Sequence, residues 1–189
     1  MTINAHRRFG YVAAGVLAIA AASASPLVAQ GGEQANERVG VTTPVSLEPS
    51  HVAPARSMLR SLVGTWRFEI WFAGNLDGAP DASGTRVVTT LYDDLRLEWT
   101  EQLDHSNVRG QGMLGFDPTS DRFFSSSVYT TGAAPEFMTG VLDDAEPRVT
   151  FRPITVAAGA SPSSFSILDQ NHFTWVPLDR AWRATFTRQ

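Results

Sequence analysis

Apolar and polar residues alternate along most of the chain after position 65. At the start of this region, the large apolar side chains of Trp66, Phe68 and Ile70 are separated by Arg67 and Glu69. This period of two is typical of a half-buried β-strand. Similar segments follow at short intervals, over residues 85–92, 95–101, 108–116, 122–130, 136–142, 148–155, 164–169, 172–177 and 181–187.

Turn-forming residues separate these segments, among them Asp93-Asp94 and Asp117-Pro118. No helical pattern lies between the segments, so βαβ units are not expected. About ten strands at this spacing predict an all-β, antiparallel domain, either a sandwich or a barrel.

A single helical pattern precedes the first strand. Met58, Leu59 and Leu62 share one helical face, and Pro54 occupies the first turn, where its missing amide hydrogen costs nothing. We expect this short helix to cap one end of the β-domain. Residues 30–53 lack periodicity and are rich in Gly, Pro, Glu and Thr, which predicts a flexible lead-in.

The first thirty residues have the pattern of a secretion signal. Arg7 and Arg8 precede an apolar run from Tyr11 to Ala24, and cleavage is expected after Ala24 or Ala29. The run has 14 residues, whereas a membrane-spanning helix needs about 20. We therefore expect a signal peptide over 1–29, a periplasmic or secreted mature chain, and no stable membrane span after cleavage.

The residues Gly64-Thr65-Trp66 place a G-x-W motif at the head of the first strand, directly after the helix. This motif resembles the opening of lipocalins and other calycins, in which the tryptophan closes the barrel floor. The resemblance implies a lipocalin-like barrel over 54–189, with Gly64 and Trp66 as structural residues. By analogy with lipocalin floors, it also suggests that Arg183 in the last strand packs over Trp66.

A longer stretch, from Met58 to about Asp121, resembles the bacterial domain-of-unknown-function 1579 family. The resemblance rests on the Leu-x-x-Leu-Val-Gly-x-Trp opening and on the G-x-G-x-x-G-F-D pattern at 110–117. The family has a lipocalin-like barrel and carries no settled activity. The resemblance therefore implies a fold and not a function.

Composition and charge argue against several classes of partner. The formal net charge is −4, and the 15 basic residues, all of them arginine, are scattered singly, so nucleic acid is not an expected partner. The chain has no cysteine, which excludes disulfides and thiol catalysis. The G-x-G-x-x-G at 110–115 is followed by a turn and another strand, and not by the helix that dinucleotide binding requires.

Metal and cofactor sites are not expected either. His105 and His172 belong to the β-domain, and neither has a second histidine at ligand spacing. A haem held by one axial histidine would have to use one of these two. The segment Asp143-Asp144-x-Glu146 lacks the alternating oxygen ligands of a calcium loop, so we interpret it as an acidic hairpin turn.

Candidate residues for chemistry or binding gather around a few strands. Glu98 alternates with apolar neighbours, which favours an outward polar position over that of a buried general acid or base. Most aromatic residues must form the core, but a minority are candidates to line a ligand cavity. The catalytic candidates are Glu98, His105, Tyr92 and Glu101, and the ligand-binding candidates are Trp71, Trp99, Tyr129 and Trp175.

Three hypotheses about function follow, and the oligomeric state is left open. The first is binding of a small, largely apolar molecule in the barrel, which needs a pocket above ~300 Å³. The second is an isomerase, cyclase or lyase, which needs at least two titratable residues converging on one cavity. The third is an interaction module, which a filled interior together with a contiguous apolar surface patch would favour.

Overall fold

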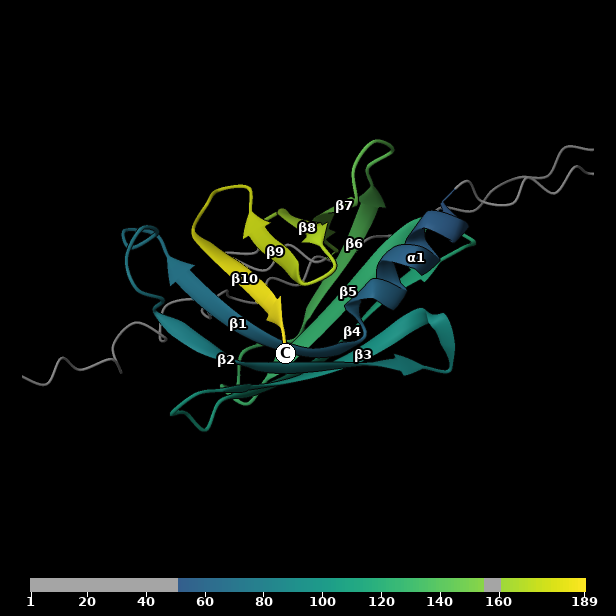
Figure 1. Cartoon of the computed structure of the whole chain (residues 1–189). Helices are drawn as coiled ribbons and strands as arrows, with labels where there is room; N and C mark the ends of the chain where they lie inside the picture. The colour runs from purple at the N-terminus through teal and green to yellow at the C-terminus, as the bar shows by residue number, and fades with distance from the viewer. Residues whose placement is uncertain (1–50, 155–160) are drawn as a thin grey trace, which may run out of the picture.

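The computed structural model of the chain describes residues 51–154 and 161–189 (Figure 1). The predicted signal peptide and the lead-in up to residue 50 lie outside these ranges. Within them, one helix is followed by ten strands. The elements are α1 (Val52–Leu62), β1 (Gly64–Phe72), β2 (Ala82–Leu91), β3 (Asp93–Leu103), β4 (Arg109–Asp117), β5 (Arg122–Tyr129), β6 (Glu136–Leu142), β7 (Arg148–Pro153), β8 (Ser163–Asp169), β9 (His172–Pro177) and β10 (Trp182–Arg188).

Helix α1 buries the apolar face that the sequence predicts. Met58, Leu59 and Leu62 lie on this face and join the barrel core. The helix begins at Val52, two residues before the predicted start, and Pro54 still lies in its first turn. No helix in the described ranges is long and apolar enough to cross a membrane.

The strands form one closed antiparallel barrel in the order β1-β10-β9-β8-β7-β6-β5-β4-β3-β2. Neighbours in sequence are therefore neighbours in space, and β10 closes the barrel against β1 (Figure 1). The prediction of an all-β, antiparallel, lipocalin-like barrel of about ten strands with a short capping helix is confirmed.

The chain enters the barrel through Gly64, which has a φ of +138°. A Cβ at this position would lie 2.6 Å from Nη1 of Arg188. The backbone conformation therefore requires glycine here, and a larger residue would also displace the Arg188 guanidinium.

The alternation along each strand separates an inner face from an outer face. On β1, Trp66 and Phe68 are buried inside the barrel. Phe173 stacks on Phe186 with ring centroids 4.1 Å apart, and it meets Trp66 edge-on at 4.7 Å. Each fully buried side chain of this size contributes about 1.5–3 kcal/mol, so aromatic packing supplies much of the stability.

The turn between β2 and β3 differs from the prediction of a turn at Asp93-Asp94. Asp93 already belongs to β3, and Tyr92 makes the turn with a φ of 60°. The Asp94 carboxylate instead accepts hydrogen bonds from Arg56, at 2.8 Å, and from Arg60, at 2.5 Å. These contacts tie α1 to the barrel.

The arginine that packs over Trp66 is Arg188, and the prediction of Arg183 is wrong. The guanidinium carbon of Arg188 lies 4.2 Å from the Trp66 ring centre. In the β1–β10 register Trp66 pairs with Arg188 and Trp71 pairs with Arg183, so Arg183 packs over Trp71 at 4.5 Å. The analogy with lipocalin floors suggested Arg183, whereas strand register decides which side chains meet.

Replacing Arg188 with alanine is expected to lower the free energy of unfolding by about 2 kcal/mol. The variant loses the contact with Trp66 and the hydrogen bonds that Arg188 donates to the carbonyl groups of Val63, at 2.9 Å, and Ser61, at 2.5 Å. Urea unfolding measures the change. The exposed Arg122→Ala is the matched control, and equal losses in the two variants would contradict the assigned role.

His51 links the start of α1 to two turns of the barrel. Its Nδ1 lies 2.6 Å from Oδ2 of Asp121, and its Nε2 lies 2.8 Å from Oδ1 of Asp144. The hydrogen bonds with Asp144 and Asp121 raise the pKa of His51 above the ordinary value of 6.5. A protonated imidazole donates from both nitrogens, which suits two carboxylate acceptors.

The stability that this link contributes is expected to depend on pH. Because the folded pKa of His51 is raised, the contribution is complete below pH 6.5 and is lost as the pH rises through the folded pKa. Urea unfolding of the wild type and of His51→Gln should therefore differ most below pH 6.5 and least at alkaline pH. A difference that stays constant with pH would refute the protonated link.

Candidate functional site

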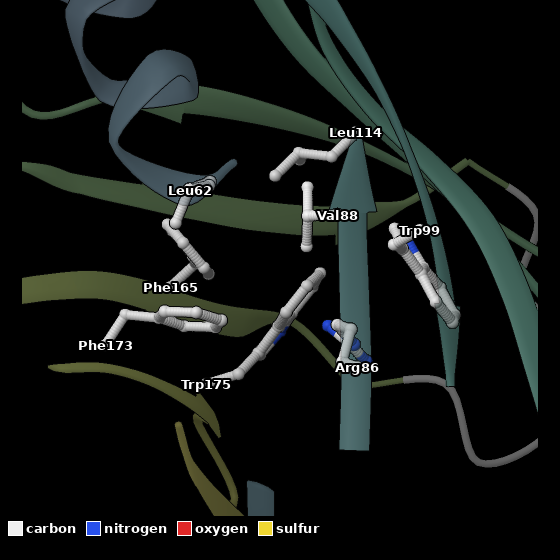
Figure 2. Close-up of a pocket in the computed structure, with 8 residues that line it drawn as sticks. All are labelled: Leu62, Arg86, Val88, Trp99, Leu114, Phe165, Phe173 and Trp175. Atoms are coloured by element: carbon white, nitrogen blue, oxygen red, sulfur yellow. The ribbon is translucent and has the colours of Figure 1, made fainter. Parts of the chain in front are cut away.

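Four of the predicted site residues come together inside the barrel, around Arg86 of β2. Trp99 and Glu101 lie on the inner face of β3, and the rings of Trp99 and Tyr129 are 6.3 Å apart. Trp175 of β9 lines the same small cavity as Trp99 and Arg86 (Figure 2). These five residues are the candidate site that the fold assembles.

Arg86 and Glu101 form a buried ion pair. They face each other in the β2–β3 register, and Nε and Nη2 of Arg86 donate to Oε2 of Glu101 at 2.9 and 2.6 Å. The side chains are only 10% and 4% exposed. The Arg86 guanidinium lies between two rings, 4.2 Å from the centre of Trp99 and 4.7 Å from that of Phe186. The positive charge of Arg86 is therefore paired with Glu101, and its guanidinium is already in contact with two aromatic rings of the protein.

Tyr129 extends this cluster on β5. Burial, followed by the nearby Glu101 carboxylate, raises the pKa of the Tyr129 phenol well above its usual value. The hydroxyl therefore stays protonated at physiological pH. With Arg86 paired and Tyr129 neutral, the cluster presents no free charge to a ligand.

Two glycines of β4 make room for the aromatic rings. A Cβ on Gly110 would lie 2.6 Å from the Tyr129 ring, and a Cβ on Gly112 would lie 2.5 Å from the Trp99 ring. The rings thus rest directly on the β4 backbone. The G-x-G pattern serves close packing, as expected for glycines in a strand rather than in a nucleotide loop.

The space left inside the barrel is small. The cavity beside Arg86 has a volume of about 20 Å³, enough for a water molecule. Ligand pockets usually measure ~300–1,000 Å³. Around the Arg86–Glu101 pair the interior is thus closely packed. The cavity is lined by Leu62, Arg86, Val88, Trp99, Leu114, Phe165, Phe173 and Trp175, which converge from α1 and several strands (Figure 2).

The other three catalytic candidates lie outside the barrel and apart from one another. Glu98 is exposed on the outer face of β3, where it accepts a 3.4 Å hydrogen bond from Thr89. Tyr92 is 94% exposed in the β2–β3 turn. His105 is exposed in the β3–β4 turn. Of the four, only Glu101 reaches the interior.

Trp71 also lies away from the cluster. Trp71 is three positions after Phe68 on β1 and therefore faces the other side of the strand, away from the interior. Its indole Nε1 donates a hydrogen bond to the Gly78 carbonyl oxygen at 2.9 Å. Arg183 covers its ring and donates to the Leu76 carbonyl oxygen at 2.6 Å. Trp71 thus holds the β1–β2 loop against the outside of the barrel.

The histidines offer no assembled metal site. His105 and His172 are both exposed, and His172 is hydrogen-bonded to the Asp169 carboxylate at 2.9 Å. Over residues 51–154 and 161–189, no three His, Cys, Asp or Glu side chains are grouped as metal ligands.

Several apolar side chains are exposed on the outer face of β4, β5 and β6, around Ser126. Met113 pairs with Ser126, which pairs with Phe137, so two large side chains flank a small one across three strands. Met113 is 39% exposed and Phe137 is 50% exposed. We call this surface the β4–β6 face; it consists of Met113, Phe124, Ser126, Val128, Phe137 and Ile154, the last joined to Phe137 by a backbone hydrogen bond.

Sequence reasoning missed this face. In the sequence, Phe137 and Val128 look like ordinary apolar residues of alternating strands. Their outward position can be recognised only when it is known which alternate positions of each strand face the interior. Once Phe123 and Gly140 are placed inside, the register puts Phe124 and Phe137 outside.

Comparisons with known proteins identify the family. A family model described as "Protein of unknown function (DUF1579)" matches residues 51–164. A solved redesigned β-barrel is similar over 71% of this chain and 95% of its own, with 17% identity and a TM-score of 0.41. No curated protein matches the chain.

Proposed function

The chain belongs to the DUF1579 family, described as proteins of unknown function, and we propose its function from the barrel itself. We propose that it is an interaction module that binds a partner protein through the β4–β6 face. The observation that carries the proposal is a contrast: the cavity beside Arg86 inside the barrel measures about 20 Å³, while Met113 and Phe137 remain exposed outside, on either side of Ser126. Exposed contiguous apolar surface on a soluble domain is typical of an interaction site.

The two other hypotheses have less support. An apolar ligand in the barrel needs a pocket above ~300 Å³, and the packed rings occupy that space. An enzyme needs titratable groups around a cavity that admits a substrate. Glu101 and Tyr129 do meet inside, but the neighbouring cavity holds about 20 Å³.

Photo-cross-linking in the host organism tests the interaction. A photoreactive amino acid at position 137 should give one defined protein adduct, which mass spectrometry identifies. The same photoreactive group at the exposed position 187 is the control, because β10 lies outside the β4–β6 face. Met113→Arg should abolish the adduct of position 137, because it places a charge at the centre of the contact.

If the protein cross-linked at position 137 is a second copy of this chain, that copy is the partner. Equal adducts from positions 137 and 187, or an adduct that Met113→Arg leaves unchanged, would refute the proposal.

We also propose that the module acts outside the cytoplasm, in the periplasm or as a secreted protein. The support is the basic start and the short apolar run before Ala24. N-terminal sequencing of the protein from fractionated cells should find Ser25 or Gln30 as the first residue. A cytoplasmic protein that retains residues 1–24 would overturn this proposal.

A further inference from the structure

A second concave feature lies outside the barrel, between α1 and the turn that joins β6 to β7. Its volume is about 390 Å³, within the ~300–1,000 Å³ that ligand sites usually occupy. This cleft is distinct from the β4–β6 face and does not depend on the function proposed above. It is lined by Pro54, Ser57, Met58, Ser61, Leu142, Asp143, Asp144, Ala145, Glu146, Pro147 and Ile167.

Helix α1 and the barrel supply an apolar floor. Residues 54, 57, 58 and 61 follow the spacing of one helical face, so a single side of α1 forms one wall. Met58 and Leu142 are buried and belong to the core, and Ile167 of β8 is half-buried against that core. An apolar group placed here would be removed from water on several sides.

Three carboxylates form the opposite rim. Oδ1 of Asp143 accepts hydrogen bonds from the backbone amides of Ala145 and Glu146, which fixes the turn. Asp144 is 92% exposed and is held through Oδ1 by His51. Within the described ranges, Oδ2 of Asp143 and Oδ2 of Asp144 have no hydrogen-bond partner, so each remains able to accept one.

No arginine is among the described residues that line this cleft, and the basic side chain of His51 is bonded to Asp144. Arg56 and Arg60 of α1 are bonded to Asp94, on another side of the helix. Arg148 is bonded to Glu146 and leaves Asp143 and Asp144 without an arginine partner among the described residues. The cleft therefore combines an apolar floor with a rim of net negative charge, because Asp143 has no cationic partner among the described residues and His51 is shared between Asp144 and Asp121.

We propose that this cleft binds a small organic cation with an apolar body, such as an arylalkyl ammonium. The apolar body lies on Met58 and Ile167, and the ammonium donates to the carboxylates of Asp143 and Asp144. Charge complementarity selects this ligand class, because an anion of the same shape would meet the same carboxylates unfavourably.

The methionine methyl groups give a direct test by NMR. Besides Met1, the chain has three methionines, and each reports on a different place. Met58 lies in the cleft, Met113 on the β4–β6 face, and Met138 against the barrel core. With isotope-labelled methionine methyl groups, phenylpropylammonium should shift the Met58 signal and leave the Met113 and Met138 signals in place.

Two further probes test the role of charge. Phenylpropanoate and phenylpropanol share the phenyl group and chain length of the cation but are anionic and neutral. The neutral probe should bind more weakly than the cation, and the anion should not shift Met58 at the same concentration. Equal shifts from cation and anion would overturn the proposal.

Variants of the chain complete the test. Asp144→Asn should weaken binding of phenylpropylammonium by roughly two- to five-fold, the range of an exposed ion pair, whereas Asp77→Asn, in the β1–β2 loop, should have no effect. Ser57→Trp should fill the cleft and abolish the shift. A Met58 signal that does not move in the wild type, or an affinity unchanged in Asp144→Asn, would overturn the proposal.

Discussion

Replacing Gly112 with alanine is expected to lower the free energy of unfolding by about 3 kcal/mol or more. The added Cβ would lie 2.5 Å from Cζ2 of Trp99 and closer still to the carbonyl oxygen of Ser126. The first neighbour is a buried ring and the second is backbone of the adjacent strand, so neither can give way without moving β5 or the core. Urea or thermal unfolding measures the change.

Gly110→Ala is the matched comparison on the same strand. The nearest neighbours of its Cβ would be side-chain atoms, those of Tyr129 at 2.6 Å and of Glu101 at 2.9 Å. Because side chains can shift more easily than backbone, we expect a smaller loss, and we expect Tyr129→Leu to recover part of it. If Gly112→Ala were as stable as the wild type, the rings would not rest on β4 and the core would be looser than described.

Replacing Glu101 with leucine is expected to cost about 3–5 kcal/mol, because Arg86 would remain charged and unpaired inside the barrel. In the wild type the two side chains are 10% and 4% exposed, so water cannot replace the lost carboxylate. Denaturant unfolding of the variant measures this loss. A far smaller loss would mean that water reaches Arg86 and that the interior is open.

The double variant Arg86→Met with Glu101→Leu distinguishes an unpaired charge from a packing defect. It removes both charges, and we expect it to recover most of the stability lost in Glu101→Leu. The half-exposed pair Arg67–Asp104, with side chains 39% and 33% exposed, is the control. Its disruption by Asp104→Asn should cost at most about 1 kcal/mol.

The alternation of residues was enough to predict an all-β, antiparallel domain. Each predicted strand has a counterpart in the barrel, because the core side of a strand requires apolar residues at every second position. The same alternation predicted that Glu98 faces outward, which the structure confirms. The G-x-W resemblance then selected a barrel, and strand order confirms that choice.

The contacts between strands were beyond reach of the sequence, because they depend on register. Glu98 and Glu101 differ by three positions and therefore face opposite sides of β3, but only the β2–β3 register brings Arg86 to Glu101. The β1–β10 register likewise decides that Arg188, and not Arg183, covers Trp66. A shift of one residue would give every side chain a different partner and turn the shifted strand's side chains to the opposite face.

The size of the cavity inside the barrel could not be predicted from the sequence either. An aromatic-rich barrel is compatible with a ligand cavity or with a filled core, and the choice depends on where small residues oppose the rings. Here Gly110 and Gly112 lie beneath Tyr129 and Trp99 and let the rings enter the space that a ligand would need. The sequence shows the glycines and the rings but not their juxtaposition.

Native mass spectrometry most directly tests the central claim, that the barrel is a filled core and that its function lies on the outside. The protein is purified gently from its own host as the Ser57→Trp variant, in which the cleft beside α1 is blocked. We predict the mass of the mature chain, alone or with a protein partner, and no bound small molecule. A small molecule present in stoichiometric amount in this variant would contradict the account, because the barrel would then be the binding site.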